Sequence, residues 1–228
     1  MTAEPKKTGG DLAYSVVKAA LSAIPVAGGP VAELFAYLVA EPIAKRRDAW
    51  IGEIAGKLQE LEQRAEQPLI EKLRDDPSFT TVLLGASQIA MRNHQTEKIT
   101  ALRNAVLNAA LGELPDDVER GIVLALVDRL TPAHMAVLSL MQEPTKHEAV
   151  VAYTAHLMMG GLAQVVTAGV PSLAGRNELV EIIWRDLNEA GLLNSSGLNA
   201  TMSGRGLTEK RTTAFGDRFL KFVSDPLS

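Results

Sequence analysis

The four histidines are the side chains of this sequence best suited to metal binding or acid-base chemistry at neutral pH. They are His94, His134, His147 and His156. Only His147-Glu148 begins like the His-Glu-x-x-His motif of zinc proteases, and Val151 stands where the second histidine would be needed. We therefore expect no metal site, and we interpret all four histidines as solvent-facing or capping residues.

Two carboxylate pairs could in principle provide a general acid and a general base. Asp75-Asp76 and Asp116-Asp117 each adjoin a proline at a predicted helix boundary. There a carboxylate accepts hydrogen bonds from free backbone amides and meets the positive end of the helix dipole, so capping is the favoured role. Ser87 follows Gly85, but Ile89 stands where a nucleophile elbow requires glycine. The sequence therefore predicts a protein that is not an enzyme, with no cofactor and no small-molecule substrate.

The composition is that of a folded globular protein with no bulk positive charge. Of the 228 residues 46% are hydrophobic and 22% are charged, and the formal net charge is −4. A nucleic acid would therefore have to bind to a local basic patch. Cysteine is absent, which excludes disulfides, thiolate nucleophiles and Cys-type metal sites and fits a reducing compartment. We expect a cytoplasmic protein, either free or peripheral to the inner membrane.

The stretch from Leu12 to Ala44 is strongly apolar and is interrupted in its middle by two prolines and two glycines between Ile24 and Pro30. This pattern predicts a helical hairpin with small residues at its bend. Each arm is shorter than the roughly 20 residues that a spanning helix needs. Lys18 and Glu33 would also be costly in lipid. Two interpretations stay open: a core hairpin around which the other helices pack, or a hairpin released on activation to enter a membrane or bind a partner.

The basic cluster Lys45-Arg46-Arg47 follows this hairpin directly. In the second interpretation it would lie at the lipid headgroups, where lysine and arginine are favoured. Beside Glu41 and Asp48 it could equally be a solvated helix face. The residues assigned to the membrane or partner site are Ile24, Pro25, Gly28, Gly29, Pro30, Leu34, Phe35, Lys45, Arg46 and Arg47.

Hydrophobic periodicity predicts a bundle of helices over residues 12–130, after a flexible tail at 1–11. The expected elements are an amphipathic helix from near Pro42, a short turn after Pro68, and helices that begin at Ser78, Thr96 and Asp116 or Asp117. Gly112 should close the helix from Thr96. The run from Gly121 to Leu130 is so apolar that we expect it to be buried nearly all round.

Residues 131–228 resemble a winged-helix-like module in their predicted order of elements. Thr131-Pro132 should start a helix that runs to about Gln142. Thr145 and Glu148 have the spacing of a capping box for a helix that ends at Gly160-Gly161. Four further elements are predicted after it. They are a turn at 162–168, a helix capped by Asn177 and closed by Gly191, a two-stranded hairpin within Leu192 to Thr208, and a last helix from Thr213 to Val223. The fold class is therefore mainly α with one small β-hairpin.

The charges of this module argue against sequence-specific DNA reading. The helix that would enter the major groove carries Glu178, Glu181, Asp186 and Glu189 against Arg176 and Arg185, and acidic side chains repel phosphates. The possible nucleic-acid contacts lie on the predicted wing, at Arg205, Lys210 and Arg211. We favour an interaction module, with a winged-helix DNA-binding regulator as the alternative.

Four short patterns carry a resemblance to a known family. They are the bend from Ala20 to Gly29 that leads to the basic cluster, the spacing of Glu97-Lys98-Ile99 and Leu102-Arg103-Asn104, Leu130-Thr131-Pro132-Ala133-His134, and the closing Leu207-Thr208 followed by Thr213-Ala214-Phe215-Gly216 and Phe219-Leu220. The closing pattern is similar to the end of the Abi-alpha group, which is associated with abortive phage infection. The resemblance implies a bacterial helical protein, cytosolic or membrane-associated, that takes part in phage defence and has no catalytic residues to carry over. Together with the residue patterns it predicts a non-enzymatic interaction protein that binds a membrane, a protein partner or a second copy of itself.

Overall fold

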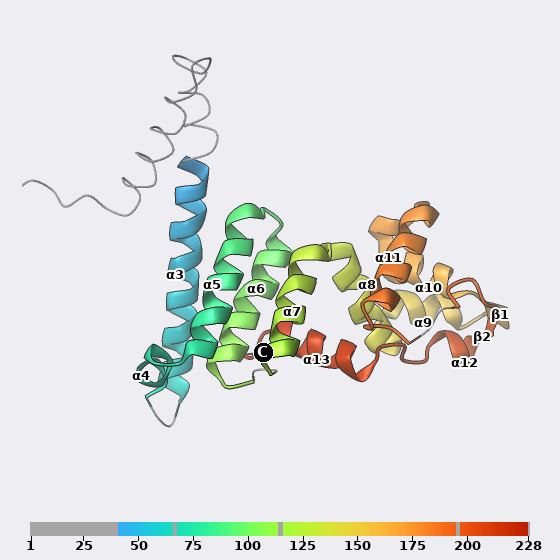
Figure 1. The fold of residues 1–228 in the computed structure, drawn as a ribbon. Helices are drawn as coiled ribbons and strands as arrows, with labels where there is room; N and C mark the ends of the chain where they lie inside the picture. Colours follow the sequence, from blue (N-terminus) through green and yellow to red (C-terminus); the bar gives the residue numbers. More distant parts are fainter. Residues whose placement is uncertain (1–40, 66–67, 114–115, 195–196, 228) are drawn as a thin grey trace, which may run out of the picture.

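The computed structural model describes residues 41–65, 68–113, 116–194 and 197–227. The predicted tail at 1–11 and the apolar arms between residues 12 and 40 lie outside the described residues, so the hairpin stays a prediction. The described chain is mainly helical, with a small two-stranded antiparallel sheet. Figure 1 shows the helices arranged in a row from α3 at one end to the sheet at the other, with α13 running along the lower side.

The elements follow each other in chain order with short connections. They are α3 (Glu41–Arg64), α4 (Leu69–Arg74), α5 (Pro77–Arg92), α6 (Thr96–Ala110), α7 (Asp117–Arg129), α8 (Pro132–Gln142), the 3-10 turn η2 (Pro144–Lys146), α9 (Glu148–Thr154), β1 (Met159–Gly160), α10 (Leu162–Gly169), the 3-10 turn η3 (Pro171–Leu173), α11 (Asn177–Glu189), β2 (Met202–Ser203), α12 (Gly204–Leu207) and α13 (Ala214–Val223).

The helix starts of the N-terminal half agree with the prediction except at one cap. The helix from near Pro42 is α3, and it buries Trp50 and Ile54 as its apolar stripe requires. The cap of α5 is Asp76 rather than Ser78, because its carboxylate accepts from the backbone N–H groups of Ser78 and Phe79 at 2.8 and 3.1 Å. With Pro77 as the first helical residue, Ser78 already lies inside the first turn.

The central helix of the described bundle is α6. From Ala101 to Ala110 every residue of α6 except Arg103 is buried. The prediction that 121–130 is buried all round is wrong, because Ile122 is 47% exposed on one side of α7 while Val127 is buried on the other. An apolar run in the sequence shows that a helix carries little charge. It does not show on how many sides other helices cover that helix.

Two predicted caps of the C-terminal half are wrong for local reasons. Thr145 and Glu148 form no capping box, because Pro144 starts a 3-10 turn and α9 begins only after His147, which makes no side-chain cap bond. The predicted helix to Gly160-Gly161 ends at Thr154, since Gly160 belongs to β1. The other wrong cap is Asn177, which is the first residue of α11 rather than its cap.

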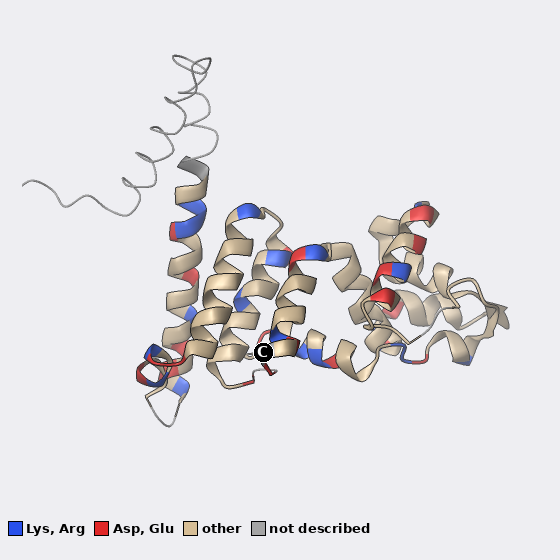
Figure 2. Cartoon of the chain, in the orientation of Figure 1, with Lys and Arg blue, Asp and Glu red and all other residues tan. Residues whose placement is uncertain are grey.

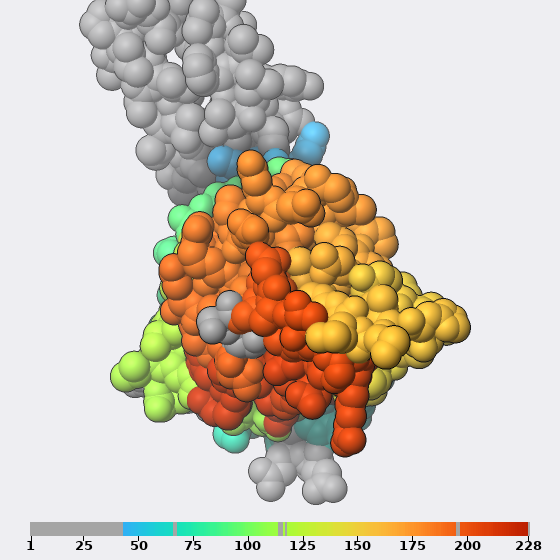
Figure 3. All heavy atoms as spheres, turned by 90° about the vertical axis from the view of Figure 1, so that its right-hand side faces the viewer, coloured from blue at the N-terminus to red at the C-terminus, as the bar shows by residue number. Residues whose placement is uncertain are grey.

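The small sheet joins segments that are far apart in the sequence. β1 pairs with β2 in antiparallel register, with Met159 opposite Ser203 and Gly160 opposite Met202. The strand pairing expected within Leu192 to Thr208 is therefore wrong: Leu193 forms a separate antiparallel bridge with Thr212. In Figure 3 the chain after residue 200 accordingly lies between the orange surface of α11 and the yellow residues around β1.

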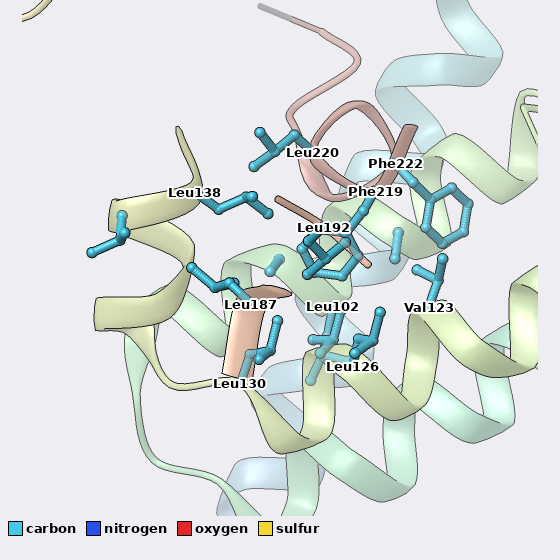
Figure 4. Close-up of a cluster of buried hydrophobic side chains, with 14 of the residues drawn as sticks. Leu102, Val123, Leu126, Leu130, Leu138, Leu187, Leu192, Phe219, Leu220 and Phe222 are labelled. Carbon is cyan, nitrogen blue, oxygen red and sulfur yellow. The ribbon is translucent and has the colours of Figure 1, made fainter. Parts of the chain in front are cut away.

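The two predicted halves meet in one hydrophobic cluster. Figure 4 shows Phe219, Leu220 and Phe222 of α13 converging on side chains from the rest of the chain. Those partners are Leu102 of α6, Val123 and Leu126 of α7, Leu130, Leu138 of α8, Leu187 of α11, and Leu192. α13 therefore belongs to the predicted C-terminal module by sequence but packs against the central helix of the N-terminal bundle.

Candidate functional site

The basic cluster Lys45-Arg46-Arg47 lies in the first turns of α3, directly after the apolar segment. Lys45 and Arg46 are exposed, whereas Arg47 is half-buried and pairs with Asp48 at 2.8 Å. The guanidinium of Arg46 also donates weakly, at 3.5 Å, to the carbonyl of Met91 at the end of α5. The apolar part of the predicted site, Ile24, Pro25, Gly28, Gly29, Pro30, Leu34 and Phe35, lies outside the described residues.

A shallow cavity of about 240 Å³ adjoins this cluster, between α3 and the α5–α6 connection. Its wall contains Trp50, whose indole N–H donates to the Ser87 hydroxyl at 2.9 Å, and Glu53, which pairs with Arg103 of α6 at 2.5 Å. These contacts fix α3 against the bundle. Trp50 and Glu53 are thus engaged in this contact, and the other polar side chains of the wall are Arg46, Asn93 and the exposed His94.

A larger cavity of about 470 Å³ lies where α6, α7 and α13 meet. Its charged walls are already paired: Arg218 with Glu119 at 2.7 Å, and Lys221 with Glu113. Each pair joins α13 to a helix connection or helix start of the N-terminal bundle. We therefore assign these charges to holding α13 in place.

The three predicted nucleic-acid contacts do not form one basic surface. Arg205 is exposed, but Lys210 pairs with Asp217 at 2.5 Å. The side chain of Arg211 is only 17% exposed and donates to the carbonyl of Gly206 at 2.6 Å. Partial burial acts to raise the pKa of Asp217, but hydrogen bonds from Lys210, Thr212 and Gln142 outweigh it and hold the pKa below its usual value. Two of the three cations therefore stabilise the loop before α13.

The outward side of α11 is acidic, as the sequence predicted. Glu178, Glu181 and Glu189 are exposed there, against the single exposed base Arg185 within the helix. The large apolar side chain exposed on this side is Ile182, with 40% of its surface accessible. A helix with this surface repels phosphates in the groove of a duplex.

His134 does not face solvent, although it does cap a helix. Its Nδ1 accepts from the backbone N–H of Thr131 at 3.3 Å, so its Nε2–H is the donor to Asp186 of α11 at 3.4 Å. This arrangement needs a neutral imidazole. Burial lowers the pKa of His134 and outweighs the opposing effect of Asp186.

His134→Gln is expected to reduce the acid sensitivity of folding. Because the pKa of His134 is lowered in the folded state, the unfolded chain binds the proton more tightly, and stability is lost as pH falls below about 6.5. Glutamine can keep the capping interaction with Thr131 but does not titrate. Urea unfolding between pH 7 and 5 should show a shallower decline for this variant than for the unmodified chain. His156→Gln, at an exposed site, is the control, and an equal decline in all three proteins would contradict the assignment.

Sequence reasoning missed three buried polar residues of α6. Lys98 is 5% exposed and donates from Nζ to the backbone carbonyl of Asp128 at 2.5 Å. Burial lowers its pKa, and the nearby Arg92 adds to this effect while Asp128 opposes it. Asn104 and Asn108 are each 4% exposed and bind the end of α13. Asn104 and Asn108 lie on the side of the helix opposite Leu102 and Val106, where helical periodicity predicts solvent exposure, so the sequence carries no local signal of their burial.

Among the described residues, no three histidine, aspartate or glutamate side chains gather closely enough to hold a metal ion. No single helix in the described ranges has the length and apolarity to cross a membrane, although Val118–Arg129 and Pro132–Gln142 reach the threshold together across a bend of 118°. Comparison with protein-family models, with curated proteins and with solved structures found no match.

Proposed function

We propose that this chain is a non-enzymatic helical interaction protein that engages a membrane through its apolar segment 12–40, with the basic start of α3 at the headgroups. The observation that carries the proposal is the position of Lys45 and Arg46, exposed in the first turns of α3, which follows a segment of 29 residues with only two charges. Each lysine or arginine near an anionic surface contributes about 1 kcal/mol, and buried apolar side chains contribute more.

The central position of α6 supports this proposal over a purely structural hairpin. A core hairpin would have to occupy the middle of the bundle, and in the described chain that place is taken by α6, which is buried over nearly its whole circumference. A protein or a second copy of this chain is the other class of target for the same apolar segment. The resemblance to the Abi-alpha group supports a role in phage defence, in which membrane engagement would follow infection.

The full chain is expected to sediment with vesicles that contain about a third anionic lipid. Reversing the three cluster charges, Lys45→Glu with Arg46→Glu and Arg47→Glu, should weaken this binding by about a hundredfold, because three contributions of about 1 kcal/mol are lost. The matched control reverses Arg64, Lys72 and Arg74, which are exposed at the other end of α3 and on α4. If the unmodified chain stays in the supernatant with every vesicle composition, the membrane role is wrong.

The role in defence is tested in cells and independently of vesicles. A bacterial strain that expresses the chain should lose viability early after phage infection and release fewer phage than a strain with the charge-reversed variant. Equal phage yields from the two strains would contradict a defence role for this site.

A winged-helix DNA-binding regulator is the second candidate. Its support is the order of elements, in which α10, η3 and α11 are followed by the bridge between Leu193 and Thr212, as a wing would follow a recognition helix. The acidic surface of α11 and the engaged Lys210 and Arg211 count against it. We expect no shift of duplex DNA at low salt. A shift that is lost with Arg205→Ala and with rising salt would favour this function instead.

A further inference from the structure

The outward side of α5 carries no charge over almost the whole length of the helix. From Pro77 to Met91 every residue is uncharged, and only Arg92 at the end is basic. In Figure 2, α5 is correspondingly tan along nearly all of its length. Leu84 is 59% exposed in the middle of this side, between the exposed polar residues Thr81 and Gln88.

The neighbouring helix α7 continues this uncharged surface. Arg92 of α5 pairs with Asp128 of α7 at 2.5 Å, and Gly85 lies so close to Leu124 that an added Cβ would be 3.2 Å from its Cδ1. These contacts show that α5 and α7 run side by side in the same direction, with Gly85 of α5 beside Leu124 of α7. Val118 is 73% and Ile122 is 47% exposed, and no charge occurs between Gly121 and Val127. We call Leu84, Val118, Ile122 and Ala125 the outer face.

A surface helix normally carries charged or polar residues on its outward side. The inward sides of α5 and α7 are covered by α6, which contacts both helices, so the outer face is directed away from the core. Leu84, Val118 and Ile122 are large exposed apolar side chains on two adjoining helices, and apolar side chains that gather on a surface are typical of binding sites. It needs an occupant that is itself apolar and carries few charges.

We propose that the apolar segment Leu12–Ala40 of the same chain docks on the outer face when it is not engaged with its target. This segment has 29 residues, of which only Lys18 and Glu33 are charged, and it ends where α3 begins at Glu41. α3 contacts α5 directly, so the segment is tethered beside the face that it would cover. If helical, its predicted arms of 10 to 13 residues span about 15–20 Å, so each arm is short enough to lie along the 16-residue α5, which is roughly 24 Å long.

The tether also favours this occupant over a second copy of the chain. A directly attached segment experiences an effective concentration in the millimolar range, far above that of a second molecule in dilute solution. Docking would cover the apolar side chains of both partners while the target is absent. The inference rests on the proposed function and extends it. It states where the segment that would bind the membrane is located when no membrane is bound.

The test uses the full chain and the absence of native cysteine. Leu84→Cys is labelled with a benzophenone maleimide, irradiated without lipid, and the crosslinked peptides are identified by mass spectrometry. Most crosslinks from position 84 should fall within residues 12–40 of the same chain. The control is Val151→Cys on α9, which is 45% exposed and should give none there. Mixing light and heavy isotope-labelled chains separates intramolecular from intermolecular crosslinks.

Crosslinks that join two chains, or crosslinks from position 84 that avoid residues 12–40, would overturn the inference. A second variant keeps the test independent of labelling. The double variant Leu84→Glu with Ile122→Glu should raise the rate of hydrogen exchange across residues 12–40 at least tenfold. The control Val151→Glu should leave that rate unchanged. Equal exchange rates in the double variant and the control would also overturn the inference. Neither experiment contains a membrane, so intramolecular crosslinks without any vesicle binding would refute the proposed function and leave the docking intact.

Discussion

Asn108→Ala is expected to lower the free energy of unfolding by about 2–3 kcal/mol, the cost of leaving buried carbonyls without a donor. The Asn108 amide, buried in the middle of the bundle, donates to the carbonyls of Phe222 and Ser224 at 2.8 and 2.9 Å. These carbonyls belong to the end of α13, where the helix itself supplies no donor. Asn104 adds a bond to the carbonyl of Val223 at 2.9 Å, so one side of α6 caps the last turn of α13.

The control for this prediction is Asn188→Ala. The Asn188 amide donates to Trp184 of its own helix at 2.8 Å and is only half-buried, so its loss should cost less than 1 kcal/mol. Asn108→Asp should be worse than Asn108→Ala, because it places a carboxylate opposite carbonyl oxygens. Urea unfolding followed by circular dichroism measures all three. Equal midpoints for Asn108→Ala and Asn188→Ala would show that the contact with α13 contributes little.

Gly216→Ala is expected to destabilise the protein by about 2–3 kcal/mol, as overpacking of a rigid contact does. Gly216 lies in the first turn of α13 and donates its N–H to the hydroxyl of Thr213. A Cβ at this position would overlap the carbonyl oxygen of Leu192 and lie 3.2 Å from its carbonyl carbon. Because backbone atoms cannot turn aside, α13 would have to move away from the segment after α11, which Thr213 also binds at 3.0 Å.

Gly56→Ala provides the matched comparison, since a methyl group there meets nothing within 4 Å in the interior of α3. It should stabilise the protein by about 0.5–1 kcal/mol through helix propensity. Thermal unfolding of the two variants should therefore shift in opposite directions. A Gly216→Ala protein as stable as the unmodified chain would mean that α13 is free to move relative to Leu192.

The sequence by itself determined the helical class and most helix starts, because these depend on neighbouring residues. Thr131 before Pro132, Thr213 before α13, and Gly112 and Gly191 after their helices lie where capping chemistry predicts. The acidic surface of α11 could also be predicted from the sequence. Ile183 and Leu187 are buried at helical spacing, so the carboxylates lie on the outward side. The same local reasoning failed at Ser78, because Asp76 and Ser78, on either side of Pro77, could each serve as the cap.

Only the tertiary structure decided which helix is central, which strands pair and which cations are available. α6 is less apolar in sequence than the run in α7, yet it is buried because other helices surround it, and its polar Asn104 and Asn108 are satisfied by α13 more than 100 residues later. Lys210 and Arg211 were predicted on a basic wing, but Lys210 pairs with Asp217 and Arg211 donates to the carbonyl of Gly206. Local patterns constrain only neighbouring residues along the chain, whereas burial and pairing depend on which distant segments meet.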